Sequence, residues 1–457
     1  MADIAGLHAF SETPERDVAR FFAGREAFLD HIKKACEGAA HTIAEGGKII
    51  SATRLFYGAR GAGKTSLLTE FHVHAARGNF GTPAPVIVDL PSSQSLRREE
   101  DVILQIAEAL GKDSLFRTTT HSDARVNADI PVIGGGGVTK GQVQNPPAAT
   151  FFHLKQITKT LSPRRPILLC VDEIQNMNPE AKDIMDILQQ GKHGLPIIPI
   201  YAGLGNSLNV IMRHGVSRPV SGYIHGVEAL ASTEAEAAVT AMLDRFKVDQ
   251  SGADRDWPAT LAQRADCWPQ HLHNAMRALA MELIRRDVKG VLARVNPEAV
   301  FTHERRLRML AHGWRMSEMI SDHRELAARV MQRVVASTPT RSEVKQIIAV
   351  LHKTRSCTLT EGVSVNSFFN ELLHQGLLQE FHEERADGTI VDVLRCPIPS
   401  LATFVMERGR VDSSLPLPEL AAEPPLKEAP EEEGGDPYAS PESKPPSYED
   451  ADPSKIS

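Results

Sequence analysis

Short apolar runs alternate with amphipathic segments through the first half of the chain. Four runs rich in aliphatic residues predict strands at 52–57, 85–90, 166–171 and 196–201. Apolar positions three and four residues apart predict helices between and after them, at 64–76, 98–110, 150–161 and 179–190. Because strands that alternate with helices and are apolar throughout are typical of a parallel sheet covered on both faces, we predict an α/β fold.

The pattern changes in the second half of the chain. Residues 231–335 have helical periodicity throughout and predict a helical region. Residues 341–405 predict two helices, then two strands around a turn at 386–388, which is the element order of a winged helix. Residues 113–149 interrupt the first half with a run of glycines and predict a hairpin insertion. Residues 411–457 are acidic and proline-rich, which predicts a disordered tail.

Composition excludes several classes of protein. The 457 residues are 42% hydrophobic and 24% charged, which indicates a globular protein of two or three domains. The net charge of −7 comes from the tail, so the body is neither strongly basic nor strongly acidic. No apolar run is long enough to cross a membrane, and the N-terminus lacks the features of a secretory signal. Five scattered cysteines without a CxxC pair favour neither zinc nor disulfides and predict a cytoplasmic protein.

A glycine-rich motif between the first predicted strand and helix carries the clearest chemistry. The phosphate-binding residues that it predicts are Gly58, Ala59, Arg60, Gly61, Ala62, Gly63, Lys64, Thr65 and Ser66. This GxxxxGK[ST] motif turns backbone N–H groups towards a phosphate at the N-terminus of a helix. Lys64 reaches the β- and γ-phosphates, and the Thr65 hydroxyl is a ligand for Mg²⁺. The motif therefore predicts a Walker A loop that binds a nucleoside triphosphate.

A second motif lies 108 residues after Lys64. The sequence ILLCVDE, at 167–173, is an apolar strand that ends in two adjacent carboxylates, Asp172 and Glu173. A hydrophobic core has no need for such a pair. We predict a Walker B motif, in which Asp172 holds the Mg²⁺ shell and Glu173 is the general base for the attacking water.

Together with Gly24-Arg25-Glu26, these motifs resemble those of AAA+ ATPases of the origin-recognition and transposon-regulator type. The resemblance covers roughly residues 15–285. It implies an αβα nucleotide-binding core over 15–230, a helical lid with a helical linker over 231–335, and a C-terminal winged helix over 341–405. It also implies ATP and Mg²⁺ as cofactors, hydrolysis to ADP and phosphate, and a homo-oligomer. The preference for adenine rests on this resemblance too, since no guanine-reading NKxD motif follows a core strand.

Further residues of the family pattern are matched less closely. By resemblance, Arg218 is an arginine finger that acts on a neighbouring subunit, although it also fits a solvent-facing loop. Asn206 matches the polar sensor residue after the fourth strand, or else caps a helix. Gln270 stands where the family has a second sensor arginine, and Arg277, two turns later, is a possible substitute.

The output of the ATPase has two main interpretations. In the first, which the arginine-rich stretch 301–341 favours and which we prefer, ATP is coupled to a DNA transaction, with DNA phosphates contacted by Arg305, Arg306, Arg308 and Arg315. In the second, the nucleotide state controls protein assembly through the winged helix, without DNA. The predicted recognition helix, 365–374, has no Lys or Arg and the wing is acidic, which favours a protein partner. A third interpretation is a nucleotide-binding module without turnover, and the Asp172–Glu173 pair argues against it.

Overall fold

The structure is a computed structural model of the chain. It describes residues 3–7, 23–47, 53–90, 99–111, 154, 156, 158–159, 165–177, 195–205, 207–213, 223–286, 290–353, 357–384 and 389–409. The predicted insertion at 113–149, the predicted tail at 411–457, Asn206 and Arg218 lie outside these ranges.

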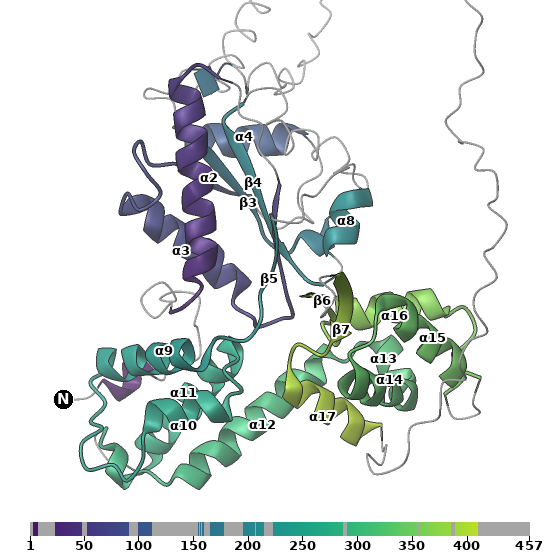
Figure 1. Cartoon of the computed structure of the whole chain (residues 1–457). Coiled ribbons are helices and arrows are strands. Elements are labelled where there is room, and N and C mark those ends of the chain that lie inside the picture. Colours follow the sequence, from purple (N-terminus) through teal and green to yellow (C-terminus); the bar gives the residue numbers. More distant parts are fainter. Residues whose placement is uncertain are drawn as a thin grey trace, which may run out of the picture. The chain divides into compact units, whose positions relative to one another are not determined.

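A five-stranded parallel sheet forms the first half of the fold (Figure 1). Its spatial order is β2-β3-β4-β1-β5. The strands are β1 (Arg54–Tyr57), β2 (Val86–Leu90), β3 (Ile167–Val171), β4 (Ile197–Gly203) and β5 (Ile224–Gly226). The α/β prediction is confirmed, and the first four strands lie close to their predicted ranges. The sequence pattern missed β5, because three half-buried residues are too short a run for periodicity to detect.

Helices cover both faces of this sheet. They are α2 (Glu26–Ala44), α3 (Lys64–Ala76), α4 (Glu99–Ala109) and α8 (Ser207–Arg213). Side chains alternate along β3: Leu168 and Cys170 pack into one core with α2 and α3. Ile167, Leu169 and Val171 pack into a second core with α4 and α8. This alternation gives three layers and explains why the strands are apolar at every position.

The next segment is helical, as the sequence predicts. It contains α9 (Ser232–Arg245), α10 (Trp257–Arg264), α11 (Pro269–Arg286), α12 (Pro297–Arg315), α13 (Glu318–Asp322) and α14 (Arg324–Ser337). Buried apolar residues of α9, α10, α11 and the start of α12 form a third core. Asn296 caps α12 by accepting the N–H of Glu298, and Pro297 suits its first turn. The nineteen residues of α12 run on from this core, and its last turn reaches the Walker A loop.

The last described segment combines helices with an antiparallel hairpin. It contains α15 (Arg341–Leu351), α16 (Val365–His374), β6 (Gln379–Glu384), β7 (Ile390–Arg395) and α17 (Pro399–Arg408). We call residues 341–409 the helix–hairpin unit. Phe368, Phe369, Leu372 and Leu373 of α16 are fully buried. Within the described ranges, no helix is both long and apolar enough to cross a membrane.

Candidate nucleotide site

The Walker A loop follows β1 at the carboxyl edge of the sheet. The Gly58 N–H donates to the Gly203 carbonyl at 3.0 Å, which anchors the loop to the end of β4. Gly61 and Gly63 have φ values of 83° and 89°, a region that favours glycine. α3 then begins at Lys64, so its free N-terminal N–H groups and helix dipole lie at the loop. The sequence-predicted phosphate cradle therefore has its expected strand–loop–helix context.

Lys64 is buried within the loop, with 6% of its surface exposed. Its Nζ donates to the carbonyls of Gly58 at 2.9 Å and Ala59 at 3.0 Å. Burial lowers the pKa of Lys64 to about 8, although the nearby carboxylates of Glu173 and Asp172 oppose this shift. The ammonium group is held by neutral oxygens, which a phosphate can replace.

The two predicted Mg²⁺ ligands are in direct contact. The Thr65 hydroxyl donates to Asp172 Oδ2 at 2.6 Å, across 107 positions of sequence. The other carboxylate oxygen of Asp172 accepts the N–H of Glu173 at 2.8 Å. A hydroxyl and a carboxylate are the hard oxygen ligands that Mg²⁺ prefers, so this pair fits the ion that the motifs imply. In the described part of the chain no group of three or more His, Cys, Asp or Glu could hold a metal.

Glu173 is held by side-chain amides that the sequence analysis missed. Its backbone is left-handed, with φ of 52°, at the turn after β3. Its Oε2 accepts hydrogen bonds from Gln175 Nε2 and, at 3.4 Å, from Asn176 Nδ2. The carbonyl oxygen of the Gln175 side chain accepts the N–H of Leu204 at 3.0 Å. Gln175 thus connects the predicted general base to the end of β4. In the sequence, the only sign of this connection is that two amide residues, Gln175 and Asn176, follow Ile174.

The Gly24-Arg25-Glu26 segment also contacts the loop. Arg25 Nη2 donates to the Ala62 carbonyl at 3.4 Å and to the carbonyl of Glu228. The Arg25 N–H donates to the Glu234 carboxylate, in the first turn of α9, at 3.2 Å. Arg25 therefore joins the Walker A loop to the start of the helical region.

The start of α11 packs on the same loop. The Gln270 N–H donates to the Gly61 carbonyl at 3.1 Å, and a β-carbon at Gly61 would collide with the Gln270 side chain. Gln270 therefore occupies the position beside the loop at which the family resemblance expects an arginine. The predicted substitute Arg277 has His303 as an electrostatic neighbour, on the side of α11 that faces α12.

The helix–hairpin unit contacts the loop from outside the sheet. The Ala59 N–H donates to Gln379 Oε1 at 3.1 Å, and Gln379 is almost fully buried. The Tyr57 hydroxyl donates to the Glu380 carbonyl at 2.9 Å. Gly376 leaves room for this contact, because a β-carbon there would lie 3.2 Å from that of Ala59. Two adjacent residues of the helix–hairpin unit, Gln379 and Glu380, thus bind the Walker A loop and the end of β1.

Two of the four arginines predicted to contact DNA are engaged inside the protein, which corrects that expectation. Arg315 is 4% exposed, and its Nη2 donates to the Arg60 carbonyl at 3.0 Å and to the Gln270 side chain. Arg308 is 13% exposed and forms ion pairs with Asp266 at 2.7 Å and Glu304 at 2.8 Å. Glu304 is four residues before Arg308 on the same helix, whereas Asp266, Arg60 and Gln270 come from distant segments that a count of basic residues does not reveal.

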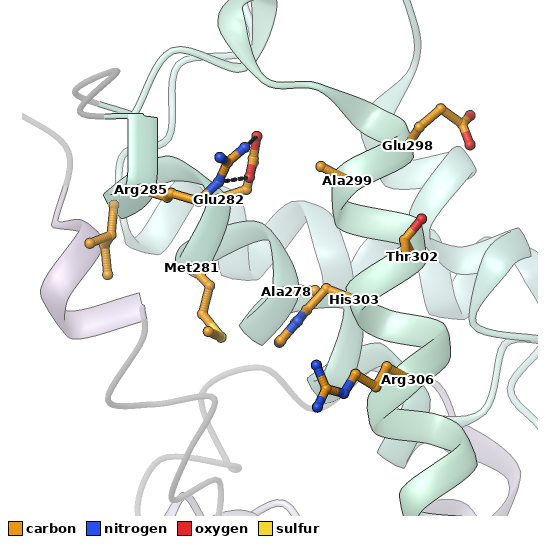
Figure 2. A pocket seen from close by; sticks show the side chains of 10 residues that line it. Ala278, Met281, Glu282, Arg285, Glu298, Ala299, Thr302, His303 and Arg306 are labelled. Carbon is orange, nitrogen blue, oxygen red and sulfur yellow. Dashed lines mark hydrogen bonds and ion pairs between the residues drawn. The ribbon is translucent and has the colours of Figure 1, made fainter.

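The other two arginines line different concavities. Arg306 lies beside His303 and Met281 in a groove of about 770 Å³ between α11 and α12 (Figure 2). In this groove Glu282 is paired with Arg285 and Arg286. Arg305 instead lines a pocket shared with Arg308 and α17. The four arginines are therefore divided between the groove, this pocket and the Walker A loop.

Comparisons with known proteins detect similarity in structure alone. No protein-family model and no curated protein sequence matches the chain. A Walker-type ATPase of Pyrococcus abyssi superposes with a TM-score of 0.46 and 14% identity, over 78% of this chain and 91% of the other. The ORC2 protein of Aeropyrum pernix, in ADPNP and ADP complexes, gives 0.46 and 12%, over 86% and 98%. The ORC1 protein of the same organism, in complex with DNA, gives 0.38 and 17%, over 88% and 96%.

The α/β P-loop fold itself is established by the sheet order and by the loop after β1.

Proposed function

We propose that the chain is a Mg²⁺-dependent ATPase of the AAA+ type. The observation that supports this most directly is the 2.6 Å contact between Thr65 and Asp172. Two motifs 107 positions apart, each recognised from sequence, meet in the arrangement that their chemistry requires. Lys64 and Glu173 lie close enough for the carboxylate to affect the lysine's pKa.

Each residue then has a distinct role. Lys64 exchanges the carbonyls of Gly58 and Ala59 for oxygens of the β- and γ-phosphates. Thr65 and Asp172 would hold Mg²⁺, which would neutralise phosphate charge. Glu173 accepts a proton from the attacking water, through a carboxylate that Gln175 and Asn176 orient by donating to its Oε2. By the family resemblance, Asn206 is a sensor of the γ-phosphate and Arg218 acts in trans within a homo-oligomer.

The contact of the helix–hairpin unit with the Walker A loop suggests which part of the protein responds to ATP binding and hydrolysis. We propose that this unit is a winged helix whose position follows the nucleotide state, because Gln379 binds the loop's own backbone. A protein partner at this unit is then the favoured output. A DNA transaction is the second candidate, and Arg305 and Arg306 remain exposed for it.

Steady-state hydrolysis of ATP tests the proposal. The protein should hydrolyse ATP in the presence of Mg²⁺, and Glu173→Gln should lower kcat by about 10²–10⁴-fold while ATP still binds. Lys64→Ala should lose ATP binding itself. Hydrolysis by Glu173→Gln at the normal rate would show that Glu173 is not the base. Measuring the same rate with double-stranded DNA, over a range of protein concentrations, distinguishes the two outputs: stimulation supports the DNA transaction.

A further inference from the structure

Two buried cations converge on the Walker A loop. One is Lys64 of the motif and the other is Arg315, at the last turn of α12 and 255 positions from the Arg60 carbonyl that it binds. Arg315 is close enough to Lys64 for its charge to lower the lysine's pKa. The positive charge at the loop is therefore larger than the motif alone provides.

Among the described residues, the hydrogen-bond partners of Arg315 are all neutral. Its guanidinium donates to the Arg60 carbonyl, the Gln270 side-chain oxygen and His312 Nδ1, the last at 2.8 Å. Within the described ranges, no carboxylate forms an ion pair with it. Burial lowers the pKa of Arg315 to about 10, and the charge of Arg60 adds to this effect. Burying a cation without a counter-ion is costly, so a site of this kind favours an anion beside it.

His312 keeps Arg315 pointed at the loop. Burial lowers the pKa of His312 to about 3, so its ring is neutral near pH 7. Because an arginine can only donate, Nδ1 is the acceptor and the proton lies on Nε2. Nε2 then donates to Ser400 Oγ at 3.0 Å, in α17. The guanidinium is thus fixed from behind, and the Gln270 side chain that it binds packs on Gly61.

We propose that Arg315 is a phosphate-binding residue of the nucleotide site, and that the polyphosphate of the bound nucleotide is its missing counter-ion. This inference rests on the proposed ATP site. On binding, the guanidinium exchanges the Gln270 and Arg60 oxygens for phosphate oxygens, which accept charge-assisted hydrogen bonds. Arg315 then supplies, from α12, the cation that Gln270 cannot supply from α11.

The alternative is that Arg315 only holds the loop in shape. A purely structural role predicts that Arg315→Lys, which loses the planar fork that holds the Arg60 and Gln270 oxygens, weakens ATP binding as much as Arg315→Gln does. A phosphate-binding role predicts that the charge kept by Arg315→Lys restores part of the ATP affinity. AMP, which lacks the β- and γ-phosphates, shows whether the loss is confined to the polyphosphate.

Titration with a fluorescent ATP analogue, and competition by ATP and AMP, tests the inference in the full chain. Arg315→Gln should weaken ATP binding by about tenfold or more, as expected for a lost charge-assisted hydrogen bond, and leave AMP binding nearly unchanged. Arg315→Lys keeps the charge without the planar fork and should lie between Arg315→Gln and the unsubstituted protein. Arg308→Gln, on the same helix but bound to carboxylates, is the matched control and should bind ATP normally.

The outcomes separate this inference from the proposed function. Normal ATP affinity in Arg315→Gln, while Lys64→Ala loses it, overturns the inference and leaves the ATP site intact. Equal weakening of ATP and AMP also overturns it. Failure of the unsubstituted protein to bind ATP refutes the proposed function instead. Circular dichroism monitors folding, and should Arg315→Gln not fold, the ATP-to-AMP comparison in Arg315→Lys decides.

Discussion

Arg308 and Arg315 lie two turns apart on α12, and both are largely buried, but their surroundings differ in one respect. Arg308 faces two carboxylates, of Glu304 and Asp266, and its positive charge is compensated within the protein. Arg315 faces a main-chain carbonyl, an amide oxygen and a neutral imidazole. The same residue type on the same helix is therefore a structural ion pair at one position and an uncompensated cation at the other.

This difference indicates where a ligand belongs. A buried ion pair satisfies itself and needs nothing from solution, whereas an uncompensated buried charge leaves a site better suited to an anion. Arg315 borders the loop that the Walker motif assigns to phosphate, while Arg308 lies against the Asp266 turn before α11. Stability should therefore depend on Arg308, and nucleotide affinity on Arg315.

The largest effect expected from this comparison is on the stability of an Arg308 variant. Arg308→Met should lower the free energy of unfolding by about 3 kcal/mol at pH 8, because Glu304, only 1% exposed, loses its partner. Burial already raises the pKa of Glu304 to about 7, in spite of Arg308. Removing Arg308 raises it further, so the variant's deficit should shrink below pH 7, where Glu304 is protonated in both proteins.

Urea denaturation of both proteins at pH 5.5 and pH 8 measures this deficit. ATP affinity of Arg308→Met, measured where the protein is folded, should match that of the unsubstituted chain. A stable Arg308→Met with weakened ATP binding would reverse the assignment of the two arginines.

The contrast between the two arginines was not predictable from sequence, although much around them was. The sequence predicts strand β3 and its end at Asp172 and Glu173, because the apolar run and the two carboxylates that follow it are neighbours in the chain. The Walker motifs predict that Thr65 and Asp172 serve the same Mg²⁺ ion, and in the structure the two side chains are hydrogen-bonded to each other. From the sequence, Arg305, Arg306, Arg308 and Arg315 are predicted alike to contact DNA phosphates. The Asp266, Arg60 and Gln270 groups that bind two of them come from distant segments, and only the packing of α12 decides which of the arginines are buried.

The next, smaller effect is on the pH dependence of ATP affinity, which distinguishes the contribution of Lys64 from that of Arg315. Before nucleotide binds, Lys64 has a pKa lowered to about 8, whereas that of Arg315 is lowered only to about 10. The phosphate needs the protonated lysine, so ATP affinity is full below pH 8 and falls as pH rises through that value. Between pH 7 and pH 9 we expect about a tenfold loss, set by the fraction of Lys64 that is charged.

Isothermal titration calorimetry in buffers of different ionisation enthalpy measures this loss and the accompanying proton uptake. Lys64→Arg, if it binds ATP, should abolish the dependence because its side chain stays charged. A tenfold loss that persists in Lys64→Arg would assign the titration to another group.

The smallest effect concerns His271, whose buried ring lies near the positive charges of both arginines. The pKa of His271 is lowered to about 2, mainly by burial and further by the nearby Arg308, His312 and Arg315. The folded protein therefore keeps His271 neutral, while the unfolded chain takes up a proton as pH falls below about 6.5. The unfolded state binds more protons in this window, so stability falls on acidification. Between pH 8 and pH 6 this titration should cost about 1 kcal/mol of the free energy of unfolding, and His271→Leu should remove that cost, as measured by urea denaturation.

An unchanged pH dependence in His271→Leu would mean that the ring is protonated in the folded protein, which requires a counter-charge near the two arginines.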